Sequence, residues 1–248
     1  MTCVLYGNVM APLTAAKIKL QLKLAQKVVI CPLSKKHQKP PKSSNMLPLL
    51  DPSLSPWIIA ATDLGIRKDS FTAAIAVYEL TVLSDGSSRL VLVEEAVHKG
   101  DTKAIRFPYV PGFLSFREVP PLLQAFKKLT VSPDVILCDG QGIAHPRRVG
   151  LASHLGVVLK KPSVGCAKNK LCGTHATLPT SKGSWVPLIH EGQTVGVVYR
   201  SKTGVKPIYI SPGHLTDLPS SIALVELCLG KYRIPEPLRK AHALTKIS

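Results

Sequence analysis

The sequence predicts an α/β fold in which one mixed β-sheet is flanked by helices. Three strand patterns follow one another with short links between residues 57 and 98, which is typical of an antiparallel meander. Helical and strand patterns then alternate, which is typical of parallel strands joined by crossover helices. The 248 residues are 45% hydrophobic, enough for the core of one large domain, which we expect over residues 51–248.

Residues 1–50 have a different composition, with eight lysines and no acidic residue before Asp51. Residues 13–30 predict a basic amphipathic helix with an apolar stripe formed by Ile18, Leu22, Ala25 and Val29. The alternation of polar and apolar residues over 17–22 favours a strand instead, and this alternative stays open. The segment PLSKKHQKPPKSS predicts a solvated arm rich in Lys and Pro. We therefore expect a basic helix and arm ahead of the domain.

The predicted meander begins with WIIAAT, a buried strand pattern that leads to Asp63. Residues 71–80 and 89–98 have the next two strand patterns, and a Ser-Asp-Gly-Ser turn links them. Helices are then predicted over residues 119–129, 147–158, 220–229 and 236–244. Further strands are predicted over residues 134–138, 163–167, 195–200 and 207–210.

Two of these strands lead into an aspartate, Asp63 in IIAATD and Asp139 in VILCDG. A right-handed crossover would place the second strand beside the first and parallel to it, so both carboxylates would meet at one edge of the sheet. A carboxylate there is costly to desolvate unless it meets a cation, and two of them suit a hard divalent ion. The alternative is that each aspartate is a turn residue at a strand end.

The loop over residues 106–121 contains four prolines and a row of aromatic residues, Phe107, Tyr109, Phe113 and Phe116. Rigid aromatic side chains suit stacking on a base or wedging into a nucleic acid. The alternative is a rigid loop whose aromatic residues cap the core. Glu118, at the start of the following helix, would supply a third carboxylate.

The segment DGQGIAHPRRVG combines glycines with two arginines. Gly140 and Gly142 would let the backbone approach a ligand closely. With Pro146 in the first turn of a helix, Arg147 and Arg148 would lie at its positive end, where a bound phosphate offsets their charge. The alternative is that both arginines point into solvent.

Lys168 and His214 are two further candidates. Lys168 follows the strand SVGCA and would emerge at the same edge as the aspartates. His214, in YISPGH, follows another strand and suits proton transfer or metal binding. A single Lys or His in a loop is more often an ordinary surface residue.

The charge of the chain points to a nucleic-acid partner. The sequence has 32 Lys and Arg against 15 Asp and Glu, and a formal net charge of +17 attracts polyanions. It has no lipidation signal and no apolar run that would span a bilayer, so we expect no membrane partner. The six cysteines form no CxxC pair, which favours packing over a disulfide framework or a zinc site. We expect a cytosolic monomer, with an organelle transit peptide as the alternative explanation of the lysine-rich start.

Several long segments together resemble the signature motifs of the endonuclease V family. They are, in chain order, PYVPGFLSFRE, CDGQGIAHPRR, GLASHLG, VGCAK, YISPGH and KYRIPEPLRKAH, and the resemblance runs from about residue 57 to residue 242. A weaker likeness, QLKLAQKVV, matches the amino-terminal helix of the family. The resemblance implies a ribonuclease H-like fold, in agreement with the strand order predicted above.

The resemblance implies a Mg²⁺-dependent endonuclease of DNA repair. Enzymes of this family cleave the second phosphodiester 3′ to a deaminated adenine, which is deoxyinosine in DNA or inosine in RNA, and leave 3′-hydroxyl and 5′-phosphate ends. The segment HPRR resembles bacterial members, which favours DNA as the substrate. Two alternatives stay open, a non-catalytic nucleic-acid-binding module and a structure-specific nuclease on the same fold.

The resemblance also implies roles for single residues. Asp63, Glu118 and Asp139 match the metal-binding carboxylates of the family. Lys168 and His214 match catalytic positions near the phosphate. The substrate-binding residues that it implies are the wedge tyrosine and the segments that shape a hypoxanthine pocket, namely Tyr109, Gly112, Leu114, Gly140 and Gly142.

Overall fold

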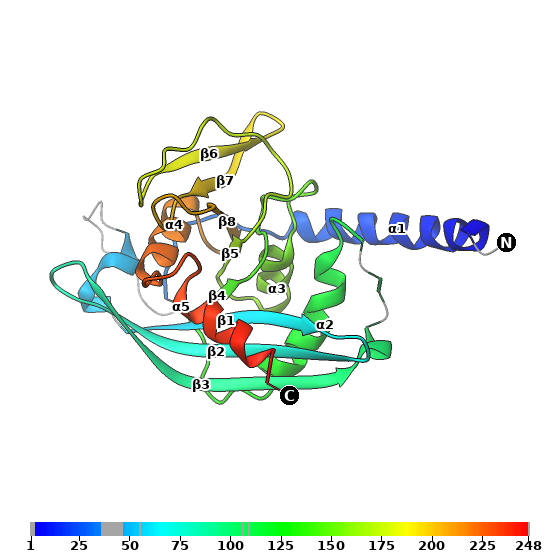
Figure 1. Cartoon of the computed structure of the whole chain (residues 1–248), viewed down its shortest axis with the longest axis horizontal. Coiled ribbons are helices and arrows are strands. Elements are labelled where there is room, and N and C mark those ends of the chain that lie inside the picture. The colour runs from blue at the N-terminus through cyan, green and yellow to red at the C-terminus, as the bar shows by residue number, and fades with distance from the viewer. Residues whose placement is uncertain (1–2, 36–46, 55, 106, 109, 248) are drawn as a thin grey trace.

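The structure, a computed structural model, describes residues 3–35, 47–54, 56–105, 107–108 and 110–247. Over these residues it contains one eight-stranded sheet with helices packed on both faces (Figure 1). The strands are β1 (Trp57–Ile66), β2 (Ser70–Val82), β3 (Ser88–Asp101), β4 (Val135–Cys138), β5 (Ser163–Ala167), β6 (Trp185–His190), β7 (Gln193–Tyr199) and β8 (Ile208–His214). The α-helices are α1 (Cys3–Ala25), α2 (Leu114–Phe126), α3 (Leu151–Leu159), α4 (Leu218–Leu227) and α5 (Glu236–Leu244), and short 3₁₀ helices lie at Pro48–Leu50, Pro52–Leu54 and Thr102–Ala104.

The strand order of the sheet is β3-β2-β1-β4-β5-β8-β7-β6. β1, β2 and β3 pair antiparallel, which confirms the predicted meander. β4 pairs parallel with β1, and β5 pairs parallel with β4, so the predicted crossover topology is also confirmed. β8, β7 and β6 extend the sheet antiparallel beyond β5. The architecture is the mixed sheet flanked by helices that the sequence predicts.

Alternate residues of β1 contribute to two layers of the core. Trp57, Ile59 and Ala61 belong to a cluster that includes residues of α4 and α5. Ala60 belongs to a second cluster, which includes residues of α2 and α3. A strand covered on both faces has an almost continuous apolar run, which is the pattern that WIIAAT shows. The residues of β1 that precede Asp63 therefore lie in the interior of the protein.

Several elements differ from the prediction, among them α2, α3 and β6. α2 begins at Leu114 rather than residue 119, which places Glu118 in the second turn of the helix. α3 begins at Leu151 rather than residue 147, and Arg148 has a φ of 58°, outside the right-handed helical region. β6 was not predicted, because only one of its six residues is buried and it contains Pro187, a residue tolerated at a sheet edge.

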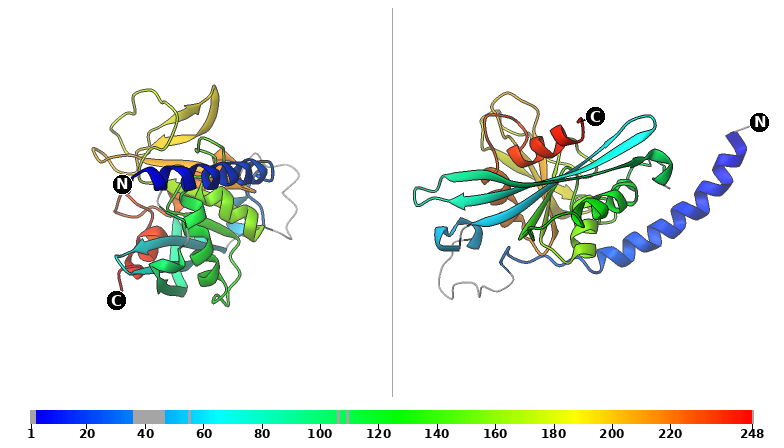
Figure 2. Two further views of the ribbon diagram at one scale, coloured as in Figure 1. Left: turned by 90° about the vertical axis from the view of Figure 1, so that its right-hand side faces the viewer. Right: turned by 90° about the horizontal axis from the view of Figure 1, so that it is seen from below.

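α1 extends away from the body of the protein, with its C-terminal end against the body (Figures 1 and 2). The helix is confirmed over the alternative strand, but the predicted apolar stripe is wrong, because Leu22 and Val29 are 49% and 46% exposed. Gln21 and Leu24 are the buried residues at this end of the helix. α1 therefore contacts the body through a short surface that includes a buried polar side chain.

The chain after α1 runs along the body. Leu215 N donates to Val29 O at 2.7 Å, and Leu33 is fully buried in the core cluster beside α4. Residues 36–46, which contain most of the predicted solvated arm, lie outside the described residues. In the part of the chain that the structure describes, no helix combines the length and apolarity needed to cross a membrane.

Candidate functional site

Asp63 and Asp139 lie side by side on neighbouring parallel strands. The register of β1 and β4 pairs Thr62 with Cys138, the two residues that directly precede the aspartates. Asp139 N donates to Thr62 O at 3.3 Å, which continues the ladder one step past β4. Asp63 lies within β1 rather than at its end, because β1 continues to Ile66. The structure thus brings both carboxylates to the same level and edge of the sheet, as the crossover argument predicts.

Glu118 joins these two carboxylates from α2. Its burial, and then the negative charges of Asp63 and Asp139, raise the pKa of Glu118 well above its usual range. Three carboxylates from three different elements therefore lie within electrostatic reach of one another. This is the grouping of distant acidic residues that the sequence predicts.

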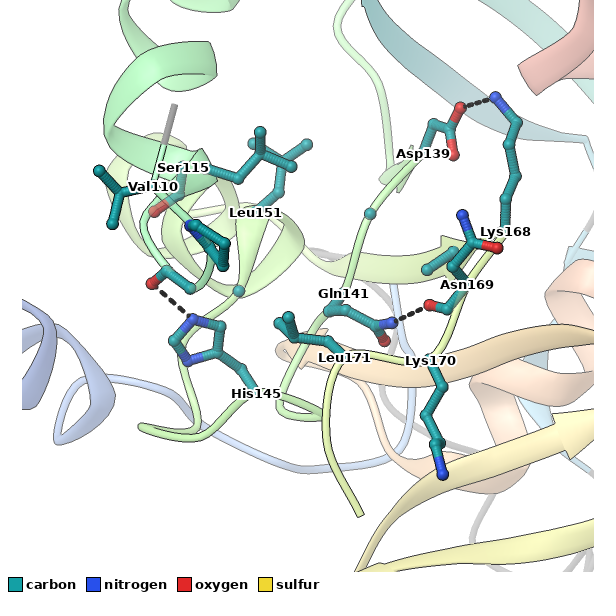
Figure 3. Close-up of a pocket in the computed structure, with 16 residues that line it drawn as sticks. Val110, Ser115, Asp139, Gln141, His145, Leu151, Lys168, Asn169, Lys170 and Leu171 are labelled. Carbon is teal, nitrogen blue, oxygen red and sulfur yellow. Dashed lines mark hydrogen bonds and ion pairs between the residues drawn. The ribbon is translucent and has the colours of Figure 1, made fainter. Parts of the chain in front are cut away.

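Each aspartate has a basic side chain beside it. Lys168, directly after β5, forms an ion pair with Asp139 (Figure 3). Burial raises the pKa of Asp139 despite this neighbour, and the pKa of Lys168 is raised because the attraction of Asp139 outweighs the effect of burial. His242, on α5, donates from Nδ1 to Asp63 Oδ2 at 2.7 Å. His242 is not among the residues predicted from the sequence, although its motif KYRIPEPLRKAH supports the family resemblance.

The three carboxylates suit a hard divalent cation. Carboxylate oxygens are the ligands that such ions prefer, and a cation would relieve the repulsion that raises the pKa of Glu118. Among the described residues, no group of three or more His, Cys, Asp or Glu side chains is arranged to hold a metal ion. Asp139 and Asp63 are held instead by Lys168 and His242. The residue types therefore fit a divalent cation, although their side chains are not preassembled around one.

A cavity of about 340 Å³ opens beside Asp139 (Figure 3). Small-molecule sites occupy about 300–1,000 Å³, so this cavity suits a group as small as a nucleobase. Its lining includes Gly112 and Leu114 from the loop and helix α2 on one side, and Asp139, Gly140 and Lys168 on the other. A base bound in this cavity would therefore lie next to Asp139.

Gly142 is not among the residues that line the cavity. A Cβ atom at this position would lie 1.9 Å from Pro212 O, and Gly142 N donates to Ser211 Oγ at 2.8 Å. The absence of a side chain is thus required for close packing against β8, and the predicted approach to a ligand is corrected for this glycine. Gly140 does line the cavity, where a glycine would let the backbone approach a ligand closely.

The two arginines of HPRR are held by groups of the protein. Arg147 donates from Nη2 to Gly112 O at 2.8 Å, and its guanidinium carbon lies 4.5 Å from the ring centre of Phe113. Arg148 donates from Nη2 to His190 O at 2.9 Å. Because α3 begins after both arginines, neither lies in its first turn, and the predicted phosphate site at that helix end is corrected.

His214 lies at the opposite end of the sheet from the carboxylates. β8 runs antiparallel to β5, so His214 pairs with Ser163 at the start of β5, whereas Lys168 follows the end of β5. His214 Nδ1 accepts a hydrogen bond from Val29 N at 3.1 Å, and burial lowers the pKa of this histidine. The structure therefore does not bring His214 to the carboxylates. The direction of a strand is not visible in its local sequence, so the sequence alone could not place His214 relative to the carboxylates.

The described aromatic residues of loop 106–121 pack on one another. The ring centre of Phe107 lies 5.9 Å from those of Phe113 and Phe116. Phe107 and Phe113 are each 5% exposed. For these three residues the structure supports the alternative in which the loop caps the core. Tyr109, the predicted wedge, lies outside the described residues, so its role stays a prediction.

Residues 46–243 match the family model described as Endonuclease V. The Endonuclease V of Rippkaea orientalis is 50% identical over 189 residues, which cover 75% of this chain and 78% of that protein. The crystal structure of the Endonuclease V of Streptomyces avermitilis is 34% identical with a TM-score of 0.73, over 92% of this chain and 89% of that one. The Ciona intestinalis Endonuclease V, in complex with a 24mer DNA containing an inosine followed by a ribo-adenosine, is 22% identical with a TM-score of 0.70, over 95% of this chain and 97% of that one. The mixed sheet is thus the ribonuclease H-like fold of these nucleases, and the chain belongs to the endonuclease V family.

Proposed function

We propose that the chain is a Mg²⁺-dependent endonuclease that cleaves the second phosphodiester 3′ to deoxyinosine in DNA and leaves 3′-hydroxyl and 5′-phosphate ends. The observation that carries this proposal is the grouping of Asp63, Glu118 and Asp139, the last of which lines a cavity large enough for a base. Membership of the endonuclease V family supports the same reaction. The net charge of +17 supports a polyanionic substrate.

The residues that would hold Mg²⁺ are Asp63, Glu118 and Asp139. When bound there, the ion would polarise the scissile phosphate and lower the pKa of the attacking water. The contribution of the protein is to keep the three carboxylates together against their repulsion. The register of β1 with β4 sets the first and third of them, α2 adds the second, and His242 orients Asp63 through its hydrogen bond.

The cavity would receive the inosine base after the base has turned out of the DNA double helix. Inosine pairs weakly with any partner, so extruding it costs less than extruding a normal base, and this difference contributes to selectivity. Lys168 brings a positive charge to the edge where the phosphate would lie, and this charge would stabilise the transition state. Tyr109 is proposed to fill the gap that the base leaves behind.

Cleavage of three end-labelled substrates, with and without Mg²⁺, tests this proposal. They are a DNA duplex with one deoxyinosine, an RNA of the same sequence with one inosine, and a DNA flap without a lesion. We expect Mg²⁺-dependent cleavage at the second phosphodiester 3′ to deoxyinosine, with product ends that a DNA ligase can rejoin. Cleavage of the RNA would add inosine-containing RNA as a second substrate. A preference for the flap would instead support a structure-specific nuclease on the same fold.

A further inference from the structure

Three side-chain donors meet at a single backbone oxygen in the wall of the cavity. Gly112 O accepts from Gln21 Nε2 at 2.9 Å, from His145 Nε2 at 2.9 Å and from Arg147 Nη2 at 2.8 Å. Gly112 has a φ of +77°, a conformation that side-chain-bearing residues rarely adopt, and it lines the cavity. The position of this wall is therefore set by the groups that hold the Gly112 carbonyl.

Gln21 is the donor that lies outside residues 51–248, because it belongs to α1. Its side chain is fully buried, although neighbouring residues of the helix are exposed. Its Oε1 accepts a hydrogen bond from Arg147 Nε, while its Nε2 donates to Gly112 O. The two ends of one amide group thus connect Arg147 with Gly112. A buried amide without such partners would be unfavourable, which explains why α1 docks at this point.

The second donor, His145, is locked by the same segment of chain. Arg147 N donates to His145 Nδ1 at 3.0 Å, so Nδ1 carries no hydrogen and Nε2 is the nitrogen that donates to Gly112 O. The guanidinium of Arg147 also lies over the ring of Phe113, the residue after Gly112. Gln21 therefore completes a network in which Arg147 has one defined orientation.

We propose that Gln21 is a positioning residue that sets the Gly112 wall of the base cavity, so that the N-terminal helix contributes to recognition of the extruded base. This inference rests on the proposed function, because it assumes that the cavity receives inosine. It assigns to α1 a role in selectivity that differs from general attraction of the nucleic-acid backbone.

The test compares two variants of Gln21 with a matched control. Gln21→Leu keeps the approximate size of the side chain and removes both hydrogen bonds, whereas Gln21→Glu keeps an acceptor for Arg147 and removes the donor to Gly112 O. The control is Gln26→Leu, which changes an exposed glutamine just past the end of the same helix. The first readout is amide exchange of Phe113, whose N–H donates to Val110 O at 3.0 Å in the cavity wall.

We expect amide exchange of Phe113 to be faster by about tenfold in both Gln21 variants, and unchanged in the control, because tenfold corresponds to about 1.4 kcal/mol, which is the scale of one buried hydrogen bond. We expect the KM for deoxyinosine DNA to rise by about tenfold, with kcat within about twofold of the parent value, because ground-state and transition-state binding weaken together. Both Gln21 variants should therefore lose selectivity against undamaged DNA.

An unchanged KM and unchanged exchange in Gln21→Leu would overturn the inference. A lower kcat and a higher KM on damaged and undamaged DNA alike, accompanied by lower global stability, would also overturn it. That result would indicate that Gln21 only stabilises the fold. If Gln21→Leu does not fold, Gln21→Glu carries the same test. A parent protein with no preference for inosine would refute the proposed function, while the exchange readout would still report whether Gln21 holds the wall.

Discussion

His242 and Asp63 form a hydrogen bond of 2.7 Å between Nδ1 and Oδ2, although 179 positions separate them in the chain. The last helix of the protein thus orients a carboxylate of the first strand. An imidazole nitrogen that faces a carboxylate acts as the donor, so Nδ1 carries the hydrogen in this pair. Such a contact behind a ligand residue sets its orientation and its basicity.

Removal of this hydrogen bond should weaken the binding of Mg²⁺ that cleavage requires. We expect His242→Ala to raise the Mg²⁺ concentration for half-maximal cleavage by about 10–100-fold, because partners of ligand residues contribute on that scale. His242→Asn, whose amide can replace Nδ1 as a donor, should recover part of the loss. The measurement is a Mg²⁺ titration of cleavage, with His175→Ala, a change of an exposed loop histidine, as the control. An unaltered titration curve for His242→Ala would contradict the proposed orienting role.

The charge of Lys168 should matter for turnover more than for binding. We expect Lys168→Met to slow cleavage by about 10²–10³-fold, because a positive group at the phosphate stabilises the transition state on that scale. The Kd for deoxyinosine DNA should change by only a few-fold. Lys182→Met, which changes an exposed lysine in the loop before β6, is the control. Equal losses of binding and turnover would mean that Lys168 serves mainly to bind the nucleic-acid backbone.

Two buried histidines should make the protein less stable in mild acid. Burial lowers the pKa of His145 and of His154 to about 4 in the folded protein, from an unfolded value of 6.5. Between these two pH values the unfolded chain binds more protons. The free energy of unfolding should therefore fall as the pH decreases from 6.5 towards 4, by up to about 1.4 kcal/mol per pH unit for each histidine.

A variant separates the contribution of one of these histidines. His154 packs edge-on against Phe116 with ring centres 5.3 Å apart, and His154→Leu puts an apolar side chain that does not titrate in its place. We expect urea unfolding at pH 7.5, 6 and 5 to show a shallower loss of stability for His154→Leu than for the parent protein. His175→Leu should follow the parent curve. Parallel curves for His154→Leu and the parent would contradict the assignment of a lowered pKa to His154.

The basic segment at the end of α1 should strengthen binding in a salt-dependent way. Lys19, Lys23 and Lys27 are exposed. We expect their joint replacement by Gln to reduce the slope of log affinity against log salt by about one unit for each phosphate that the protein no longer neutralises. The matched control is replacement of the same residues by Arg, which keeps the charge. An unchanged slope in the Gln variant would show that these lysines do not bind the nucleic acid.

Deletion of residues 1–50 would be a poor test of this segment. Leu33 and Leu49 are fully buried in the main core cluster, so their removal would open a cavity and destabilise the fold. The deletion would also remove Gln21 and its hydrogen bond to Gly112 O. Charge substitution on the surface avoids both effects.

The part of the site that was predictable from the sequence is the pairing of Asp63 with Asp139. Apolar strand runs are visible locally, and the handedness of a crossover places the two strands side by side. Glu118 was predictable as a third carboxylate, although its helix begins earlier than its pattern indicates. The strand β5 and the helix α5 were predicted with their observed bounds, because each has a short, regular apolar pattern.

The rest of the site depends on tertiary interactions that local patterns do not encode. The sequence alone does not show that His214 lies at the end of the sheet away from the carboxylates, because only the pairing of β8 with β5 reveals its antiparallel direction. His242 reaches Asp63 through the docking of α5, which has no counterpart in its sequence pattern. Gln21 lies on the buried side of α1 because of hydrogen bonds to distant residues, and an apolar stripe cannot predict such an interaction.

Asp139 is proposed above as a ligand of the metal ion used for cleavage. The most direct measurement compares Asp139→Asn with the parent protein for Mg²⁺-dependent cleavage and for binding of deoxyinosine DNA, with Asp85→Asn in the β2–β3 turn as the control. We expect Asp139→Asn to lose cleavage while its Kd stays within a few-fold of the parent value, because the side chain keeps its size and loses its charge. Cleavage that still depends on Mg²⁺ in Asp139→Asn would contradict the claim.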